Sequence, residues 1–130
     1  PTGGAYQARF ETIEGIDIYR HPLPVEADSG LGYLAEYTLA LFWQFFLSFK
    51  VKARSGFDVI QACNPPDTIF LLALFWRLVS GARFIFDHHD LNPELYEAKF
   101  GRRGPVHRLL LWLEKLTFRT ADVSIATNRT

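Results

Sequence analysis

Short apolar runs alternate with longer segments of helical spacing along this 130-residue chain. Apolar residues that recur every three or four positions indicate helices, and short runs of β-branched and aromatic residues indicate strands. From residue 59 onward the two alternate, so we expect right-handed crossovers, a parallel sheet and an α/β fold in a single domain over residues 1–130. The pattern predicts strands over residues 6–12, 16–20, 59–63, 83–87 and 123–126, and helices over residues 33–54, 68–79, 93–100 and 106–120.

For two of these helices the sequence also predicts an N-cap or a buried face. Asp67 is a good N-cap for the helix over residues 68–79. In the last helix, a face formed by Leu109, Leu113 and Leu116 is predicted to be buried, while the basic residues Arg108, Lys115 and Arg119 lie in solvent.

The long helix over residues 33–54 requires a membrane test, because Tyr33 to Phe49 carries only one charge and basic residues follow it. Seventeen residues are at the low limit for a membrane span. We expect a buried helix with one edge in water; the alternative is a helix lying on a bilayer surface. The predicted polar edge consists of residues at i+4 spacing: Glu36, Gln44, Ser48 and Lys52.

Composition limits the classes of partner. Fourteen basic and fourteen acidic residues give a formal net charge of zero, so no overall field favours nucleic acid, and we expect no nucleic-acid partner. The single cysteine, Cys63, has no internal disulfide partner, and its place at the end of an apolar run favours a small buried residue. No secretory pattern opens the sequence, and we therefore expect a cytoplasmic location.

The strand over residues 83–87 ends in a dense group of ionisable residues, Asp87-His88-His89-Asp90. In an extended segment Asp87 and His89 share one side and His88 and Asp90 the other, which disfavours a metal site built from all four. An imidazole at the carboxyl end of a strand suits acid-base or ligand-binding chemistry, and this position favours His89. The alternative is that both histidines only cap the strand or the following helix.

Other polar residues follow parallel strands and should line the same edge. Asn64-Pro65 comes after the strand over residues 59–63, and Asn128 follows the last strand. Asn64 can serve both as part of a helix-entry loop and as a ligand contact. A basic group around a glycine-bounded turn, Arg102, Arg103 and Arg108, is either a solvated surface or a contact for phosphate, from a substrate or a membrane.

Four segments together resemble the N-terminal domain of glycosyltransferase family 4, and in particular bacterial enzymes that build surface polysaccharides. The likeness covers residues 16–130 and is carried by Phe57-Asp58-Val59-Ile60-Gln61-Ala62, Asn64-Pro65-Pro66-Asp67, Phe84-Ile85-Phe86-Asp87-His88-His89-Asp90-Leu91 with Pro93-Glu94, and Ala121-Asp122-Val123-Ser124-Ile125-Ala126-Thr127-Asn128.

The resemblance implies a GT-B enzyme in which two Rossmann-like domains face a cleft and transfer a sugar from a nucleotide donor, with retention and without a metal or other cofactor. The N-terminal domain binds the acceptor, a sugar or a lipid-linked sugar. His89 matches the histidine at the catalytic centre, Asp90 is expected to orient it, and His88, Glu94, Asn64, Pro65 and Asn128 are the expected substrate contacts.

The family's first strand, its glycine-rich loop and its C-terminal donor-binding domain have no counterpart in this sequence. We therefore expect an incomplete acceptor-side domain that is inactive alone and needs a donor-binding domain in cis or in trans. A sheet without its first strand has an open edge, which predicts self-association. The alternatives are a non-catalytic binding or scaffold domain, one chain of a two-chain enzyme, and a small metallohydrolase using Asp87 and His89.

Overall fold

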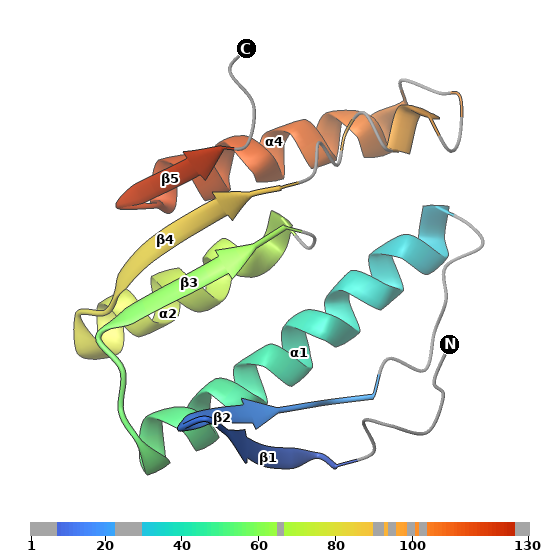
Figure 1. Ribbon diagram of the computed structural model, residues 1–130. Coiled ribbons are helices and arrows are strands. Elements are labelled where there is room, and N and C mark those ends of the chain that lie inside the picture. The colour runs from blue at the N-terminus through green and yellow to red at the C-terminus, as the bar shows by residue number, and fades with distance from the viewer. Residues whose placement is uncertain are drawn as a thin grey trace.

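A parallel sheet covered on one face by helices forms the body of the protein (Figure 1). The computed structural model describes residues 8–22, 30–64, 67–89, 93, 96–98, 101 and 104–126. The strand order is β3-β4-β5, all parallel, and a separate antiparallel pair joins β1 to β2. The elements are β1 (Phe10–Ile13), β2 (Ile16–Tyr19), α1 (Gly30–Arg54), β3 (Val59–Cys63), a 3₁₀ turn (Asp67–Ile69), α2 (Phe70–Ser80), β4 (Arg83–His88), α4 (Pro105–Thr120) and β5 (Val123–Ala126).

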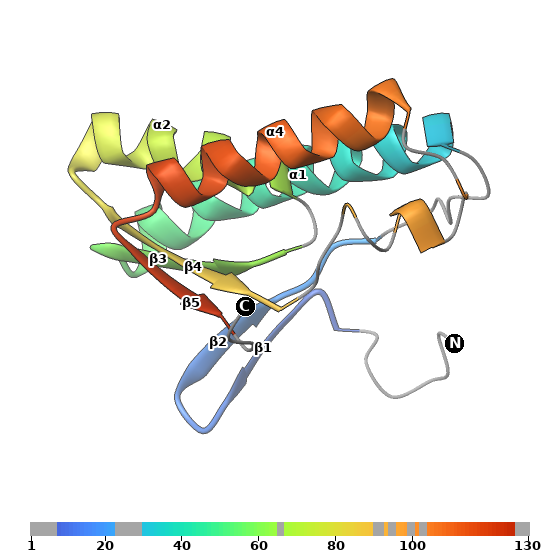
Figure 2. The same ribbon diagram turned by 90° about the horizontal axis from the view of Figure 1, so that it is seen from above.

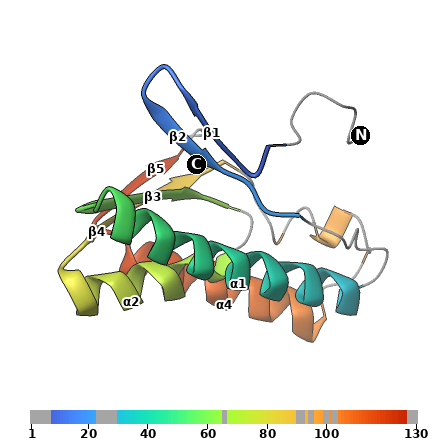
Figure 3. The ribbon, with the colours of Figure 1, turned by 90° about the horizontal axis from the view of Figure 1, so that it is seen from below.

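The three long helices form a single layer. Seen from above and from below, α1, α2 and α4 lie on one side of the β3-β4-β5 sheet, and the β1–β2 hairpin lies towards the other side (Figures 2 and 3). The predicted α/β, Rossmann-like class is confirmed. The strands predicted over residues 6–12 and 16–20 correspond to β1 and β2, which pair as a hairpin: Glu14 and Gly15 both have positive φ, 50° and 82°, as a tight turn between twisted strands requires.

The core lies between the sheet and the helices. Phe84 and Phe86 of the central strand are fully buried. They belong to a core cluster to which α2 contributes Ala73 and Trp76, and Phe118 of α4 packs against it. Because alternate residues of a strand face opposite sides, the intervening residues of β4, Ile85 and Asp87, face the other side of the sheet.

The polar edge predicted for α1 is reversed in the structure. Gln44 and Ser48 face inward, and the Ser48 hydroxyl accepts a hydrogen bond of 2.8 Å from the indole N–H of the buried Trp76. The opposite side of α1, predicted to be apolar and buried, exposes three phenylalanines: Phe42, Phe46 and Phe49. The prediction assumed that the polar side chains of α1 lie in water, whereas in the structure Ser48 faces the core and accepts a hydrogen bond from Trp76.

Three further predictions are corrected by the structure. Asp67 begins a 3₁₀ turn, and Ile69 takes the N-cap position of α2 without a side-chain cap. Leu109 is exposed, because the buried face of α4 is centred one position later, on Leu110 and Thr117. Cys63 is exposed, because its strand position faces the side of the sheet without helices.

Asp122 connects β4, β5 and α2. Its carboxylate accepts hydrogen bonds from the Phe84 N–H at 2.7 Å and from the Arg77 guanidinium at 2.6 Å. The hydrogen bond from the Phe84 N–H makes the largest contribution, and that from Arg77 the next, to lowering the pKa of Asp122 below its ordinary value of 3.8. The charged form is therefore favoured more in the folded than in the unfolded protein.

This difference predicts a pH dependence of stability. The contribution of Asp122 is fully present above its unfolded pKa and is lost as the pH falls below about 4 towards the folded pKa. We expect the urea midpoint to fall between pH 6 and pH 3, and to fall less steeply in Asp122→Asn. Glu14→Gln, in the hairpin turn, is the control and should keep the slope of the parent protein.

The sheet has open edges in the described part of the chain, since β3 and β5 each pair on one side only. Unpaired edges attract other strands, and β5 in addition exposes Val123 and Ile125. Self-association stays a prediction: we expect a mass above that of the monomer in light scattering at micromolar concentration, reduced by Ile125→Lys. A monomeric mass would contradict it.

Candidate functional site

His89 lies immediately after β4, at the carboxyl end of the central strand. Its side chain is about half exposed, at 52%, and its Nε2 lies 2.9 Å from Oδ2 of Asp87. This contact places a hydrogen on Nε2, so in the neutral ring Nδ1 is the acceptor. The imidazole is therefore oriented by a carboxylate while its other nitrogen is available at the surface.

Asn64 fixes the backbone at the same place. It follows β3, it is buried, and its Oδ1 accepts a hydrogen bond of 3.0 Å from the backbone N–H of His89. Two residues that are 25 positions apart are thus held together at the carboxyl ends of adjacent parallel strands. In open α/β sheets this edge is the usual place for ligands.

The sheet face that no described helix covers contributes Gln61, which the sequence analysis did not list, and Asp87, which it named only as a metal ligand of the metallohydrolase alternative. Gln61 donates a long hydrogen bond of 3.4 Å from Nε2 to Oδ2 of Asp87, the carboxylate oxygen that contacts His89. The alternation of side chains along the strand had already put Asp87 on the side of His89, but that argument was applied only to metal binding. Gln61 has no signal in the sequence alone, because the strand register brings it beside Asp87.

A hollow of about 620 Å³ adjoins this group. It lies between β3, the end of β2 and the inward side of α1, and Gln61 and Cys63 are among its lining residues. Two other lining residues, Tyr19 and Gln44, each bury a side-chain oxygen that has no hydrogen-bond partner among the described residues. Buried polar atoms are normally paired, so these two oxygens are exceptions in the described part of the chain.

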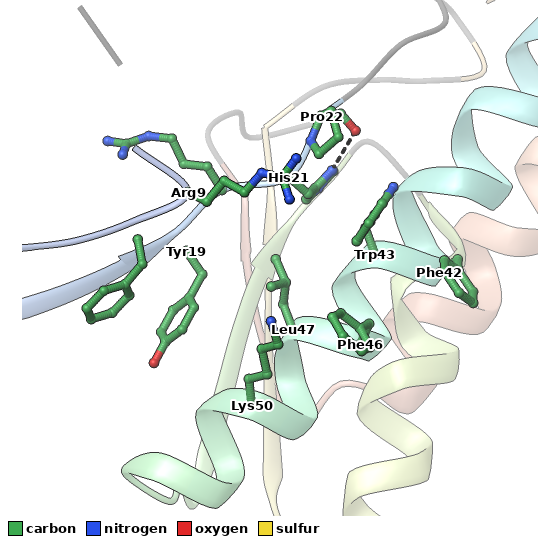
Figure 4. A pocket seen from close by; sticks show the side chains of 11 residues that line it. Arg9, Tyr19, His21, Pro22, Phe42, Trp43, Phe46, Leu47 and Lys50 are labelled. Carbon is green, nitrogen blue, oxygen red and sulfur yellow. Dashed lines mark hydrogen bonds between the residues drawn. The ribbon is translucent and has the colours of Figure 1, made fainter. Parts of the chain in front are cut away.

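A second hollow, of about 410 Å³, lies between the hairpin and the neighbouring side of α1 (Figure 4). The rings of His21 and Trp43 stack across it, 6.1 Å apart and nearly parallel. Nδ1 of His21 donates to the carbonyl oxygen of Pro22 at 3.2 Å. His89 and Asn64 are not among the residues that line this hollow.

His88 is directed to the opposite side of the sheet from His89. It is buried among Phe86 and Phe118, with ring centroids 5.6 and 5.1 Å away. Its Nε2 lies 3.6 Å from Oε2 of Glu114, too far for a hydrogen bond. The structure therefore gives His88 a packing position under α4 and separates it from the group around His89.

Of the other predicted site residues, Arg108 alone lies within the described part of the chain, and it is not brought to this group. Arg108 is exposed on α4, within the helical layer on the other side of the sheet. The remaining ones lie outside the described residues: Pro65, Asp90, Glu94, Arg102, Arg103 and Asn128.

A metal centre has few ligands to draw on in the described part of the chain, which contains no group of three histidine, cysteine, aspartate or glutamate side chains arranged to bind an ion. Asp87 and His89 alone supply two groups, fewer than a structural or catalytic zinc site takes from its protein.

We expect Asn64→Ala to lower the free energy of unfolding by about 1–3 kcal/mol, because the His89 N–H loses its acceptor at a partly buried position. Urea denaturation measures this loss. Asn64→Asp keeps Oδ1 and should recover part of it; an alanine variant as stable as the parent would show that this hydrogen bond is not needed.

Comparison with known proteins addresses the identity of the domain. A family model described as a glycosyl transferase 4-like domain matches residues 2–130. Searches among curated proteins and among solved structures gave no match. None of the described helices has the length and apolar character needed to cross a bilayer. With nearly its whole length matched, the chain belongs to the glycosyl transferase 4-like domain family.

Proposed function

We propose that this domain is the acceptor-binding half of a retaining, nucleotide-sugar-dependent glycosyltransferase that acts in the synthesis of cell-surface polysaccharide or glycolipid. The observation that carries the proposal is the hydrogen bond between Asn64 and the backbone of His89, which holds an exposed, carboxylate-oriented imidazole at the ligand-binding edge of the sheet. Membership of the glycosyl transferase 4-like family supports the reaction class.

The acceptor occupies the hollow between β3, β2 and α1. Its walls suit a sugar, because apolar side chains such as Leu47 and Val51 line it together with the exposed amide of Gln61. Gln61 connects the hollow to His89 through Asp87. An acceptor hydroxyl at the open end of the hollow then comes near Nδ1 of the imidazole.

In the transfer step, the acceptor hydroxyl oxygen forms a bond to the anomeric carbon of the donor sugar, and the bond from that carbon to the nucleotide phosphate breaks. Nδ1 of His89 accepts a hydrogen bond from the acceptor hydroxyl and takes its proton as the new bond forms, and Asp87 stabilises the resulting imidazolium. The nucleoside diphosphate leaves with the electron pair of the broken bond.

The nucleotide sugar binds to a partner domain, in cis or in trans, and the described residues are assigned no donor site. The proposal places the protein in the cytoplasm, where the exposed thiol of Cys63 stays reduced.

The test is binding followed by transfer. In NMR titrations of the full chain, a polyprenyl diphosphate-linked N-acetylglucosamine is expected to shift the amide signals of His89 and Gln61, while UDP-glucose alone shifts neither. Addition of a donor-binding partner should then give transfer from a matching nucleotide sugar. Shifts confined to the hairpin, or no shifts with any glycan in a panel of lipid-linked and free sugars, would overturn the assignment of the acceptor site.

The second candidate is a non-catalytic binding or scaffold domain. In its favour, β3 pairs with another described strand on one side only, and its free edge can accept a partner. The family match is compatible with this candidate too. The two differ in one respect. A binding domain keeps its effect on a partner enzyme after His89→Gln, whereas the acceptor half of an enzyme does not.

A further inference from the structure

The outer side of the helical layer is apolar over α1 and α2. On α1, Phe42, Phe46 and Phe49 are exposed on the side opposite Gln44 and Ser48, with Phe42 and Phe46 also at the hollow beside the hairpin (Figure 4). On α2, Leu71, Leu74 and Leu78 are exposed on the side opposite the buried Leu72 and Trp76. Leu78 is 79% exposed and Phe42 63% exposed. In both helices the exposed residues recur at helical spacing and so form continuous stripes, which are unusual on the surface of a free soluble domain.

The same side of α4 is basic. Its outward stripe, at spacings of four, three and four residues, consists of Arg108, Trp112, Lys115 and Arg119, all exposed. Glu114, the acid of this helix, turns inward towards His88. Trp112 is 56% exposed and stands between cations for which no ion pair is described. A tryptophan among lysine and arginine is typical of side chains at a membrane–water interface.

Charge is divided between the two sides of the protein. The helices α1, α2 and α4 carry seven lysines and arginines against two glutamates. Some of these cations have partners: Lys52 donates to the carbonyl of Phe57, and Arg77 is paired with Asp122. Acids gather instead on the hairpin and around the sheet: Glu11, Glu14, Asp17, Asp58, Asp87 and Asp122. The net charge of zero therefore conceals a basic helical side.

We propose that the outer side of the helical layer docks on an anionic lipid bilayer. The phenylalanines and leucines of α1 and α2 enter the region between headgroups and acyl chains, and Arg108, Lys115 and Arg119 contact lipid phosphates. Because these helices lie parallel in one layer, all three reach the surface together (Figure 2). Docking leaves the carboxyl edge with His89 at the side of the domain.

The outward stripe of α4, in which Trp112 stands among Arg108, Lys115 and Arg119, favours lipid over a protein partner. A protein covering this side would have to supply acids opposite Arg108, Lys115 and Arg119, for which the described residues show no ion pair. An anionic bilayer supplies both the charge and the apolar layer beneath it. The inference does not depend on the proposed sugar transfer, since it uses neither His89 nor the hollow beside it.

The experiment is flotation of the full chain with vesicles of phosphatidylcholine containing 30% phosphatidylglycerol, compared with phosphatidylcholine alone. We expect binding to the anionic vesicles that weakens with salt. Lys115→Glu/Arg119→Glu should reduce it by at least about tenfold, and Phe42→Ser/Leu78→Ser by a similar factor. The matched control, Ile16→Ser/Val123→Ser, removes two exposed apolar residues from the hairpin and β5 and should bind like the parent chain.

Tryptophan fluorescence locates the contact. Brominated lipids are expected to quench the parent chain, and Trp112→Phe should lose most of that quenching, because Trp76 is buried and Trp43 stacks on His21 in the hollow beside the hairpin. Three results would overturn the proposal: no binding of the parent chain to anionic vesicles, unchanged binding of both double variants, or a dimer without lipid that Phe42→Ser/Leu78→Ser dissociates. The last result would identify a second copy of the chain as the occupant of this side.

Discussion

His89→Gln is expected to lower the rate of sugar transfer by about 10²–10⁴-fold in an enzyme assembled from this domain and a donor-binding partner. Glutamine retains a polar side chain of similar reach but loses the ring nitrogen that Asp87 orients. Because the His89 side chain is about half exposed and its backbone is held through its N–H, the fold should not change. Initial rates at saturating acceptor measure the effect, and the melting temperature measures the fold.

Two companion variants separate chemistry from packing. Asp87→Asn keeps the size of the orienting group but removes its charge, so it should give a smaller loss of rate than His89→Gln. His88→Gln alters the buried neighbour and should lower stability while leaving the rate per folded molecule unchanged. Transfer that survives His89→Gln would exclude His89 from the reaction and favour the binding-domain alternative.

The three parallel strands were predictable from the sequence because short apolar runs mark them, even though β5 is exposed along its whole length. β3 and β5 have the predicted bounds, and β4 differs from its prediction by one residue, His88. The juxtaposition of His89 with Asn64 was also accessible, since it follows from the rule that parallel strands end at one edge. Neither inference needed knowledge of side-chain partners.

The predictions that were wrong or missed a residue share one cause: contacts with residues distant in the sequence determine which side chains are buried. Ser48 faces inward because Trp76, 28 residues away, needs an acceptor for its indole N–H. Gln61 joins the site because strand register puts it beside Asp87. Cys63 is exposed because the described helices cover only one face of the sheet. Periodicity reports that a helix or strand has two sides but does not say which side meets water.

Phe86→Ala is expected to have the largest effect on stability of any single truncation, about 3–5 kcal/mol. Phe86 has no exposed surface and packs between Phe118 of α4 and the neighbouring Phe84, with ring centroids 5.1 and 6.2 Å away. It lies in the central strand, so a cavity there has strands on both sides and helices above and cannot collapse easily. Urea denaturation followed by circular dichroism measures the loss.

The matched control is Phe42→Ala, which removes the same atoms from a side chain that is 63% exposed and should change the free energy of unfolding by no more than about 0.5 kcal/mol in the absence of lipid. Since small domains are stable by only about 5–15 kcal/mol, Phe86→Ala can unfold the protein altogether. Phe86→Leu then keeps the measurement possible, with a smaller loss expected because more of the ring volume is filled. Equal stability of Phe86→Ala and Phe42→Ala would mean that the β4 side chains do not form the core, and the edge that holds Asn64 and His89 would lose its structural basis.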